Sequence, residues 1–410
     1  MVIKQRGIIG KIKKFSPEIQ RLFALSNQFQ FCEKCKKTAL LFRPFDYASI
    51  SCKCQKRKET HTPRLLGQTY PQWKVMCDVQ KLHSLRFRRR FRNRAMYILP
   101  LGNTDDIMEK KFDCKNSKSL MKFVVKYTTL FFHGMDVKLL SFQNIESLGF
   151  TMRINKQTRK RQVLVTDIIE YLKKIRPNDA FCIIGWSSLD LYPCSDMNFV
   201  LGEADFLSGC AVISFGHYAS IANMNVIKNQ MKSNEKQFTK TKSCFNLSSP
   251  SSVSQPENCG NAHDLAFWRI PKVLTHEVCH LLGMHHCTFY SCLMNESNDV
   301  YEAESQPAFL CPICLRKLHK FLQFPIIERY EFIKKFLKQY ADYLPKERRW
   351  SMSDFMNTHS GSWDCKVAPS VKNKLLASQN LKRFGDSVQW LKDVLVFLRP
   401  QAQLSFNAHD

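Results

Sequence analysis

Blocks of apolar and polar residues alternate along the middle of the chain, and they predict strands and helices in turn. The run AFCIIGW (180–186) is continuously apolar over the length of one strand, which is typical of a strand buried on both faces. AMYIL (95–99) predicts a shorter buried strand that Pro100 closes. VKLLSF (137–142) and CAVISFGHYA (210–219) predict two further strands. Strands interleaved with helical segments indicate an α+β fold with a mixed sheet.

Helical periodicity accounts for much of the remaining chain. In TDIIEYLKKIRP (166–177), Ile168, Leu172 and Ile175 share one face, and Pro177 ends the helix. The other segments with this pattern are 117–132, 269–283, the stretch from 315 to 344, and a last helix near 388–398. Two polar stretches interrupt the pattern at 229–260, which predicts a flexible insertion, and at 345–380.

The segment 276–286, HEVCHLLGMHH, carries the clearest chemical signal in the chain. His276 and His280 are four residues apart, so a helix places both imidazoles on one face, where they can bind one zinc ion. Glu277 follows directly, beside the metal, where it can take the proton of a zinc-bound water. The competing interpretation is a buried helix with ordinary structural histidines.

A catalytic zinc needs a third protein ligand and one open position. His286 lies six residues after His280, and on a continuous helix it would point about 240° away from it. Gly283 allows the backbone to leave the helix and turn His286 back toward the metal. His285 is the nearest rival ligand, and the spacing after Gly283 favours His286.

Four cysteines directly after this motif predict a second zinc site. Cys287 and Cys292 form one pair and Cys311 and Cys314 form a CPIC knuckle, and two close thiolate pairs make a closed, structural zinc site. The alternative is four buried free thiols. Because Cys287 follows His286, the structural site is expected to brace the third catalytic ligand, so that loss of a cysteine damages catalysis indirectly.

These motifs carry a family resemblance. HEVCHLLGMHHC, then CLM, then CPIC resembles the archaemetzincins, zinc metallopeptidases of the metzincin clan, and the similarity extends over residues 94–330. The resemblance implies His276, His280 and His286 as catalytic zinc ligands, Glu277 as general base, Met294 in the Met-turn, and a structural zinc on the four cysteines. It also implies a metzincin-like zincin fold: a twisted mixed sheet over an active-site helix, with a four-cysteine zinc knuckle. The helical periodicity after residue 330 adds a helical C-terminal extension to this fold.

In the metzincin clan an extended peptide pairs with the edge strand of the sheet. The segment 210–219 is the strand we expect at this edge, since it is the last strand before the active-site helix. The expected domains are a basic N-terminal region at 1–93, which includes a small Cys-rich element if its cysteines bind metal, a catalytic domain at 94–330, and the helical extension at 331–410.

Charge and cysteine content add weaker signals. The chain has 410 residues, a net charge of +27 and 17 cysteines, and most of the basic excess lies in the first 130 residues. Cys32, Cys35, Cys52 and Cys54 form either a third zinc site or unpaired thiols, so we expect two zinc ions per chain, or three with this site.

An arginine-rich run precedes the first predicted strand. Six arginines in RFRRRFRNR are either a solvated face or a weak contact for nucleic acid or another anionic surface; they are Arg86, Arg88, Arg89, Arg90, Arg92 and Arg94. No apolar run is long enough to span a membrane, and the start lacks the apolar core of a signal peptide, so we expect an intracellular protein, cytoplasmic or nuclear.

The sequence therefore predicts a zinc-dependent hydrolase that cleaves peptide bonds in a peptide or protein substrate, using a zinc-activated water and a glutamate base. The alternative is a catalytically weak or silent zinc-binding protein that contacts nucleic acid or acidic partners through its basic N-terminal region. The intact Glu277 favours the enzyme, because a silent protein does not need a general base. The same zinc chemistry also permits hydrolysis of a non-peptide amide.

Overall fold

A computed structural model describes residues 6–25, 41–42, 67–102, 120–156, 159–214, 216, 259–297, 303, 306–343 and 369–399. The predicted Cys-rich element (Cys32, Cys35, Cys52, Cys54) and residues 229–258 of the predicted insertion lie outside these ranges. Among the described helices, none combines the length and the apolar character needed to cross a bilayer.

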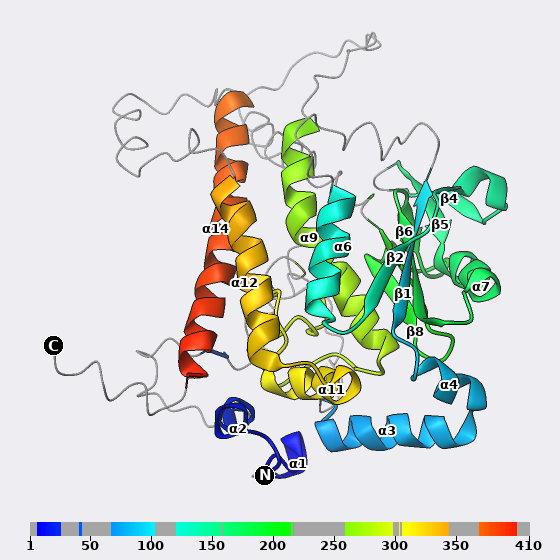
Figure 1. Ribbon diagram of the computed structural model, residues 1–410. Helices are drawn as coiled ribbons and strands as arrows, with labels where there is room; N and C mark the ends of the chain where they lie inside the picture. The colour runs from blue at the N-terminus through cyan, green and yellow to red at the C-terminus, as the bar shows by residue number, and fades with distance from the viewer. Residues whose placement is uncertain are drawn as a thin grey trace, which may run out of the picture.

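Two sheets and flanking helices make up an α+β fold (Figure 1). The strands are β1 (Ala95–Gly102), β2 (Asp136–Leu139), β3 (Gln143–Asn144), β4 (Met152–Ile154), β5 (Arg161–Leu164), β6 (Ala180–Ser187), β7 (Asp190–Tyr192), β8 (Gly202–Asp205) and β9 (Cys210–Ser214). The described helices are α1 (Arg6–Ile9), α2 (Pro17–Ala24), α3 (Tyr70–His83), α4 (Leu85–Arg90), α6 (Leu120–Phe131), α7 (Val165–Ile175), α9 (Cys259–Leu281), α11 (Pro312–Leu322), α12 (Ile326–Tyr343), α14 (Pro369–Phe397) and the short 3-10 helix η4 (Ile145–Leu148).

The main sheet is mixed, in the order β2-β1-β6-β9-β8, and β3 pairs with the far end of β1. β2, β1, β6 and β9 run parallel, and β8 is antiparallel to β9. The smaller sheet has the order β4-β5-β7. The α+β class is confirmed, and all four segments predicted from apolar runs contain a strand. Two of these strands are shorter than predicted, since β2 ends at Leu139 and β9 ends at Ser214.

Alternation along the central strand β6 explains why its sequence is continuously apolar. Ile184 and Trp186 belong to the large hydrophobic core shared with α9, while Ile183 belongs to a second core shared with α7. Successive side chains point to opposite faces of a strand. The sheet therefore lies between α7 on one side and α6 and α9 on the other (Figure 1).

Four sequence expectations are corrected. The segment 210–219 is not the edge strand: β9 lies between β6 and β8, and β8 ends the main sheet among the described strands. The first strand does not stop before Pro100 but continues to Gly102, and the polar stretch before the last helix is shorter than expected, because α14 begins at Pro369. The last two residues of the predicted insertion, Cys259 and Gly260, are helical in α9.

The larger core draws on all three predicted domains. It includes Trp73 from the N-terminal region, Leu282 from the catalytic region and Leu391 from the C-terminal extension. α14 packs along α12 beside α9 and α6, and α3 and α4 lie below the sheet (Figure 1). The domain boundaries after residues 93 and 330 stay a prediction, but these regions share one interior.

Candidate metal centre

The last two turns of α9 carry His276, Glu277 and His280. The ligand nitrogens of His276, His280 and His286 lie within 4.8 Å of one another. Their ring centroids are 4.7, 4.8 and 5.4 Å apart. The structure thus brings together the three histidines predicted from their spacing, and His286 rather than the neighbouring His285 joins the cluster.

Backbone carbonyls set the tautomer of two of these imidazoles. His276 Nδ1 lies 2.8 Å from Leu293 O, and His280 Nδ1 lies 2.6 Å from Met284 O. Because a carbonyl oxygen only accepts, each Nδ1 carries the proton and each Nε2 presents a lone pair. The two Nε2 atoms are 2.9 Å apart, so two lone pairs face each other and a cation between them would relieve the repulsion. The residues present fit a zinc ion, whose Zn–N bonds are ~2.0–2.1 Å long.

Burial supports the ligand role of these side chains. It lowers the pKa of His276 to about 4, with a further contribution from His286, and lowers the pKa of His280 well below its usual value. The imidazoles therefore stay neutral, which is the form that binds a metal. His286 is exposed, whereas His276 and His280 are half-buried, so one side of the cluster is open to solvent.

Gly283 ends α9 as the sequence predicts. Its φ is +81°, its N–H donates to His280 O at 2.8 Å, and Met284 N donates to Cys279 O at 3.1 Å. This pair of hydrogen bonds is the Schellman motif, which needs a left-handed residue at this position. A Cβ on Gly283 would also lie 2.7 Å from Met76 Cε. The tight turn reverses the chain and returns His286 to His276 and His280.

Glu277 is buried under the edge strand β8. A Cβ on Gly202, the first residue of β8, would lie 2.8 Å from both Cγ and Oε1 of Glu277. Burial, and then the charge of Glu203, raises the pKa of Glu277 to about 8. A cation on the adjacent histidines would lower this pKa, because an opposite charge favours the carboxylate. Gly202 is a residue that motif spacing does not reveal.

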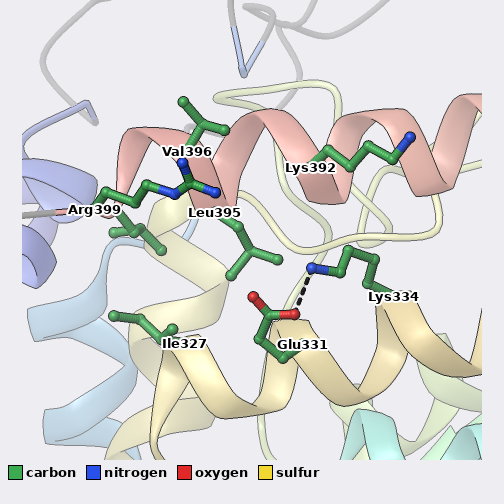
Figure 2. A pocket seen from close by; sticks show the side chains of 8 residues that line it. Ile327, Glu331, Lys334, Lys392, Leu395, Val396 and Arg399 are labelled. Atoms are coloured by element: carbon green, nitrogen blue, oxygen red, sulfur yellow. Dashed lines mark ion pairs between the residues drawn. The ribbon is translucent and has the colours of Figure 1, made fainter. Parts of the chain in front are cut away.

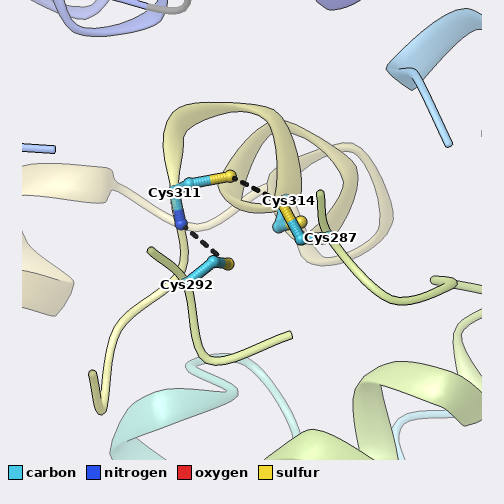
Figure 3. Close-up of side chains that lie close together, drawn as sticks. All are labelled: Cys287, Cys292, Cys311 and Cys314. Carbon is cyan, nitrogen blue, oxygen red and sulfur yellow. Dashed lines mark hydrogen bonds between the residues drawn. The ribbon is translucent and has the colours of Figure 1, made fainter. Parts of the chain in front are cut away.

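The four predicted cysteines form a second cluster (Figure 3). Cys287, Cys292, Cys311 and Cys314 are all buried, and their sulfurs lie within 4.8 Å of one another. The Sγ atoms of Cys287 and Cys311 are 3.7 Å apart. A tetrahedral zinc with Zn–S bonds of ~2.3 Å separates its sulfurs by about 3.8 Å, so this cluster fits a closed zinc site.

Backbone amides complete the environment of this cluster. Cys292 Sγ accepts from Cys311 N at 3.2 Å and from Met294 N at 3.5 Å. Burial raises the pKa of Cys292 and Cys311 well above the usual thiol value. Hydrogen bonds from the neighbouring cysteines lower the pKa of Cys287 instead. Four thiolates at this buried position would need a cation, and the amide donors would stabilise them once it is bound.

The loop 287–295, which contains the first cysteine pair, connects the two clusters. Leu293 O contacts His276 Nδ1 at 2.8 Å, and Cys287 N donates to Met294 O at 2.6 Å. Met294 is fully buried in this loop, and its role in a Met-turn stays a prediction. The sequence reasoning missed Asn295, whose side chain accepts from Cys292 N and donates to Cys287 O, both at 2.7 Å.

The arginine run does not form a continuous basic surface. Arg90 is 2% exposed, and its guanidinium donates to Phe206 O at 2.6 Å and to Leu281 O at 3.3 Å. Arg94 is half-buried and donates to Phe321 O at 3.1 Å. Arg90 therefore belongs neither to a solvated face nor to a surface that could contact nucleic acid, because its guanidinium bonds to carbonyls in the interior. Arg86, Arg88, Arg89 and Arg92 are exposed.

A separate hollow of about 370 Å³ lies between α12 and α14 (Figure 2). It is lined by Ile327, Glu331, Lys334, Lys392, Leu395, Val396, Leu398 and Arg399. Lys334 is already paired with Glu331 across one turn of α12. These residues are distinct from both metal clusters.

Fold and site together define an α+β metalloprotein in which a helix carries a His–Glu–His arrangement next to a closed four-cysteine site. A model of Peptidase family M54 matches residues 252–320, which contain both clusters. Archaemetzincin-2 of Rattus norvegicus is 33% identical over 266 residues, covering 63% of this chain and 69% of that protein. The chain belongs to the archaemetzincin family, a family of zinc metallopeptidases.

Archaemetzincin-2 of Macaca fascicularis is 35% identical over 244 residues, and the match spans 58% of this chain and 62% of the macaque protein. Among solved structures, the crystal structure of archaemetzincin from Archaeoglobus fulgidus matches with 21% identity and a TM-score of 0.34, covering 54% of this chain and 99% of that one.

Proposed function

We propose that this chain is a zinc-dependent metallopeptidase of the metzincin type that hydrolyses peptide bonds at the histidine cluster. The observation that carries the proposal is the convergence of the three imidazoles beside the buried carboxyl group of Glu277. His276, His280 and His286 would hold the catalytic zinc, and the open side of the cluster would admit water and substrate. Cys287, Cys292, Cys311 and Cys314 would hold a second, structural zinc.

When bound, the zinc would supply Lewis acidity, which makes water more acidic and a scissile carbonyl more electrophilic. Glu277 would accept the proton of the attacking water and then donate it to the leaving amine. The close approach of Gly202 would restrict the movement of this carboxyl group toward β8. The carbonyls of Leu293 and Met284 would hold two imidazoles in orientation during turnover.

The substrate would bind as an extended peptide along β8. This strand ends the main sheet among the described strands, and its first residue covers Glu277. A peptide that adds to a free strand edge gains backbone hydrogen bonds whatever its sequence. β8, rather than the segment 210–219, is therefore the strand on which we expect substrate pairing.

The proposal is tested by incubating a diverse peptide library with the purified chain and reading the products by mass spectrometry. Glu277→Ala serves as the control, because it removes the base and leaves the three imidazoles. We expect cleavage by the wild type, a loss of at least about 10²–10⁴-fold in the variant, and equal zinc content in both.

Three outcomes would contradict this assignment. Cleavage that survives in Glu277→Ala would remove the glutamate from the mechanism. Zinc loss in that variant would instead make Glu277 a ligand. A wild type that holds zinc on the histidines and cleaves no peptide would contradict peptide hydrolysis.

A further inference from the structure

The C-terminal end of α9 is held by residues of the N-terminal region, to which the family resemblance assigns no role. A helix leaves its last carbonyls without partners inside the helix. Here Leu281 O accepts from Arg90 at 3.3 Å, and Leu282 O accepts from Trp73 Nε1 at 2.9 Å. Gly283 O accepts from Gln68 Nε2 at 3.1 Å. Three consecutive carbonyls are thus satisfied by donors about 200 residues earlier in the chain.

Gln68 contacts both sides of the turn that leads to His286. Its Nε2 donates to Gly283 O, and its Oε1 accepts from His285 N at 3.2 Å. One amide side chain therefore bonds to both sides of the turn, and its contact with His285 lies one residue before His286. A primary amide is suited to this position because it provides a donor and an acceptor on adjacent atoms.

Lys317 fixes Gln68 in turn. Its ammonium donates to Gln68 O at 2.7 Å and to Gln68 Oε1 at 2.8 Å, and its side chain is 1% exposed. Lys317 belongs to α11, three residues after Cys314. The chain beside Gln68 is equally constrained, since a Cβ on Gly67 would clash with Thr288 Oγ1. Gln68 therefore joins the turn before His286 to the helix that carries the cysteine site.

We infer that Gln68 is a positioning residue for the catalytic zinc, which it stabilises by holding the Gly283–His285 turn so that His286 meets His276 and His280. The inference rests on the proposed zinc site and adds a function for the N-terminal region. Residues that orient metal ligands without touching the metal commonly change metal affinity by about 10- to 100-fold.

The test measures zinc affinity in the full chain by competition with a chelator. Gln68→Leu removes both amide contacts at similar volume, and we expect the histidine site to bind zinc about 10- to 100-fold more weakly. Gln68→Glu keeps an acceptor for His285 N and Lys317 and loses the donor to Gly283 O. The zinc affinity of this variant should therefore fall between those of the wild type and Gln68→Leu. Gln389→Leu is the matched control, because Gln389 is exposed on α14 and bonds to Asp393.

Cobalt substitution separates the two metal sites. A cobalt ion on four thiolates gives sulfur-to-metal charge-transfer absorption, whereas one on histidines does not. We expect the thiolate signal to be unchanged in Gln68→Leu. Loss of both signals together would indicate general destabilisation and overturn a specific role.

A double-mutant cycle with His286→Ala tests the route of the effect. If Gln68 acts through His286, Gln68→Leu lowers zinc affinity in the wild type and causes no further loss in His286→Ala. An equal loss in both backgrounds, or no loss in the wild type, would overturn the inference. If Gln68→Leu does not fold, Trp73→Phe serves as the second variant, because it removes one donor at Leu282 O. We expect this variant to bind zinc about 2- to 10-fold more weakly. Unchanged zinc binding in Trp73→Phe would then count against the inference.

Failure of the proposed function gives a different result. A wild type that binds zinc at the cysteines alone would contradict the histidine site. A wild type that binds zinc at both sites, with Gln68→Leu equal to it in affinity, would contradict the positioning role alone. Neither readout depends on peptide cleavage.

Discussion

Two glycines near the histidine cluster occupy places that no other residue fits without strain. Gly283 needs a positive φ to close α9, and Gly202 needs the absence of a Cβ to let β8 approach Glu277. The requirement for glycine at position 283 follows from the local spacing of the motif. The requirement at position 202 depends on two segments that are about 75 residues apart in the sequence, and it is evident only from how they pack.

Gly202→Ala is predicted to lower turnover and leave zinc binding intact. The new methyl group would lie 2.8 Å from Oε1 of Glu277, so either the carboxyl group or β8 must move. A displacement of a catalytic group by about 1 Å can cost on the order of 10²-fold. The measurement is kcat with a cleaved peptide, together with zinc content. Gly385→Ala is the control, since no atom lies within 4 Å of its Cβ; comparable turnover in both variants would refute the prediction.

At the scale of elements, the loop 287–295 joins the two metal clusters. Asn295 is 3% exposed and closes this loop, since Nδ2 donates to Cys287 O at 2.7 Å and to Tyr290 O at 2.8 Å. The loop then presents Leu293 O to His276. We expected the cysteine site to brace the catalytic ligands. In the structure the backbone of this loop, as well as Cys287, connects the cysteine cluster to the histidine cluster.

Asn295→Asp is predicted to weaken zinc binding at both metal sites, although the two side chains have almost the same shape. A carboxylate would face the carbonyls of Cys287 and Tyr290 without a proton to donate, and an unsatisfied buried group costs about 1–3 kcal/mol, more if charged. We expect a lower midpoint of thermal unfolding and faster zinc release to a chelator from both sites. Asn93→Asp, at a half-buried position that bonds to Asn178 O, controls for a general amide-to-acid effect. Zinc release at the wild-type rate would show that Asn295 does not hold the loop.

At the scale of the whole molecule, Arg90 links elements that are far apart in sequence. Its guanidinium lies 4.9 Å from the ring centroid of Phe87 and 5.0 Å from that of Phe181, and it bonds to carbonyls of α9 and of the turn after β8. Burial lowers its pKa to about 10, so it stays charged at neutral pH. Oriented carbonyls and aromatic ring faces attract this cation.

Arg90→Ala is predicted to destabilise the fold by about 3–5 kcal/mol, because it leaves a cavity and unpaired carbonyls. Arg89→Ala, one residue earlier on the exposed side of the same helix, should change stability by less than about 0.5 kcal/mol. The difference in denaturant midpoint between these neighbours is the measurement. Equal midpoints would mean that the guanidinium of Arg90 is not part of the interior.

Acid is predicted to destabilise the molecule between about pH 6.5 and pH 4. Burial, with the charge of Arg316, lowers the pKa of His319 to about 4, against a usual value near 6.5. The unfolded chain therefore binds this proton first, and stability is present above pH 6.5 and falls as the pH drops through this window. His319→Leu removes the titrating group, which packs between Phe15 and Phe324. Its unfolding midpoint should depend less on pH than that of the wild type; an unchanged dependence would contradict the assignment.

The sequence by itself determined the features that depend on neighbours along the chain. Residues four apart lie on one helix face, a glycine can close a helix, and an apolar run of strand length becomes a central strand, because each rule concerns a few consecutive bonds. The cluster of His276, His280 and His286, the four-cysteine cluster and the strand β6 followed from such rules.

Only the tertiary structure decided which strand is the edge, that Arg90 is buried, that Gly202 covers Glu277 and that Gln68 holds the turn before His286. The contacts of Arg90 with backbone carbonyls, of Gly202 with Glu277 and of Gln68 with the turn join segments 75 to 215 residues apart. Strand order and side-chain burial depend on how whole elements pack, and local periodicity is the same for an exposed and a buried arginine. The residues that would bind the metals are therefore close together in the sequence, while the residues that position them come from distant parts of the fold.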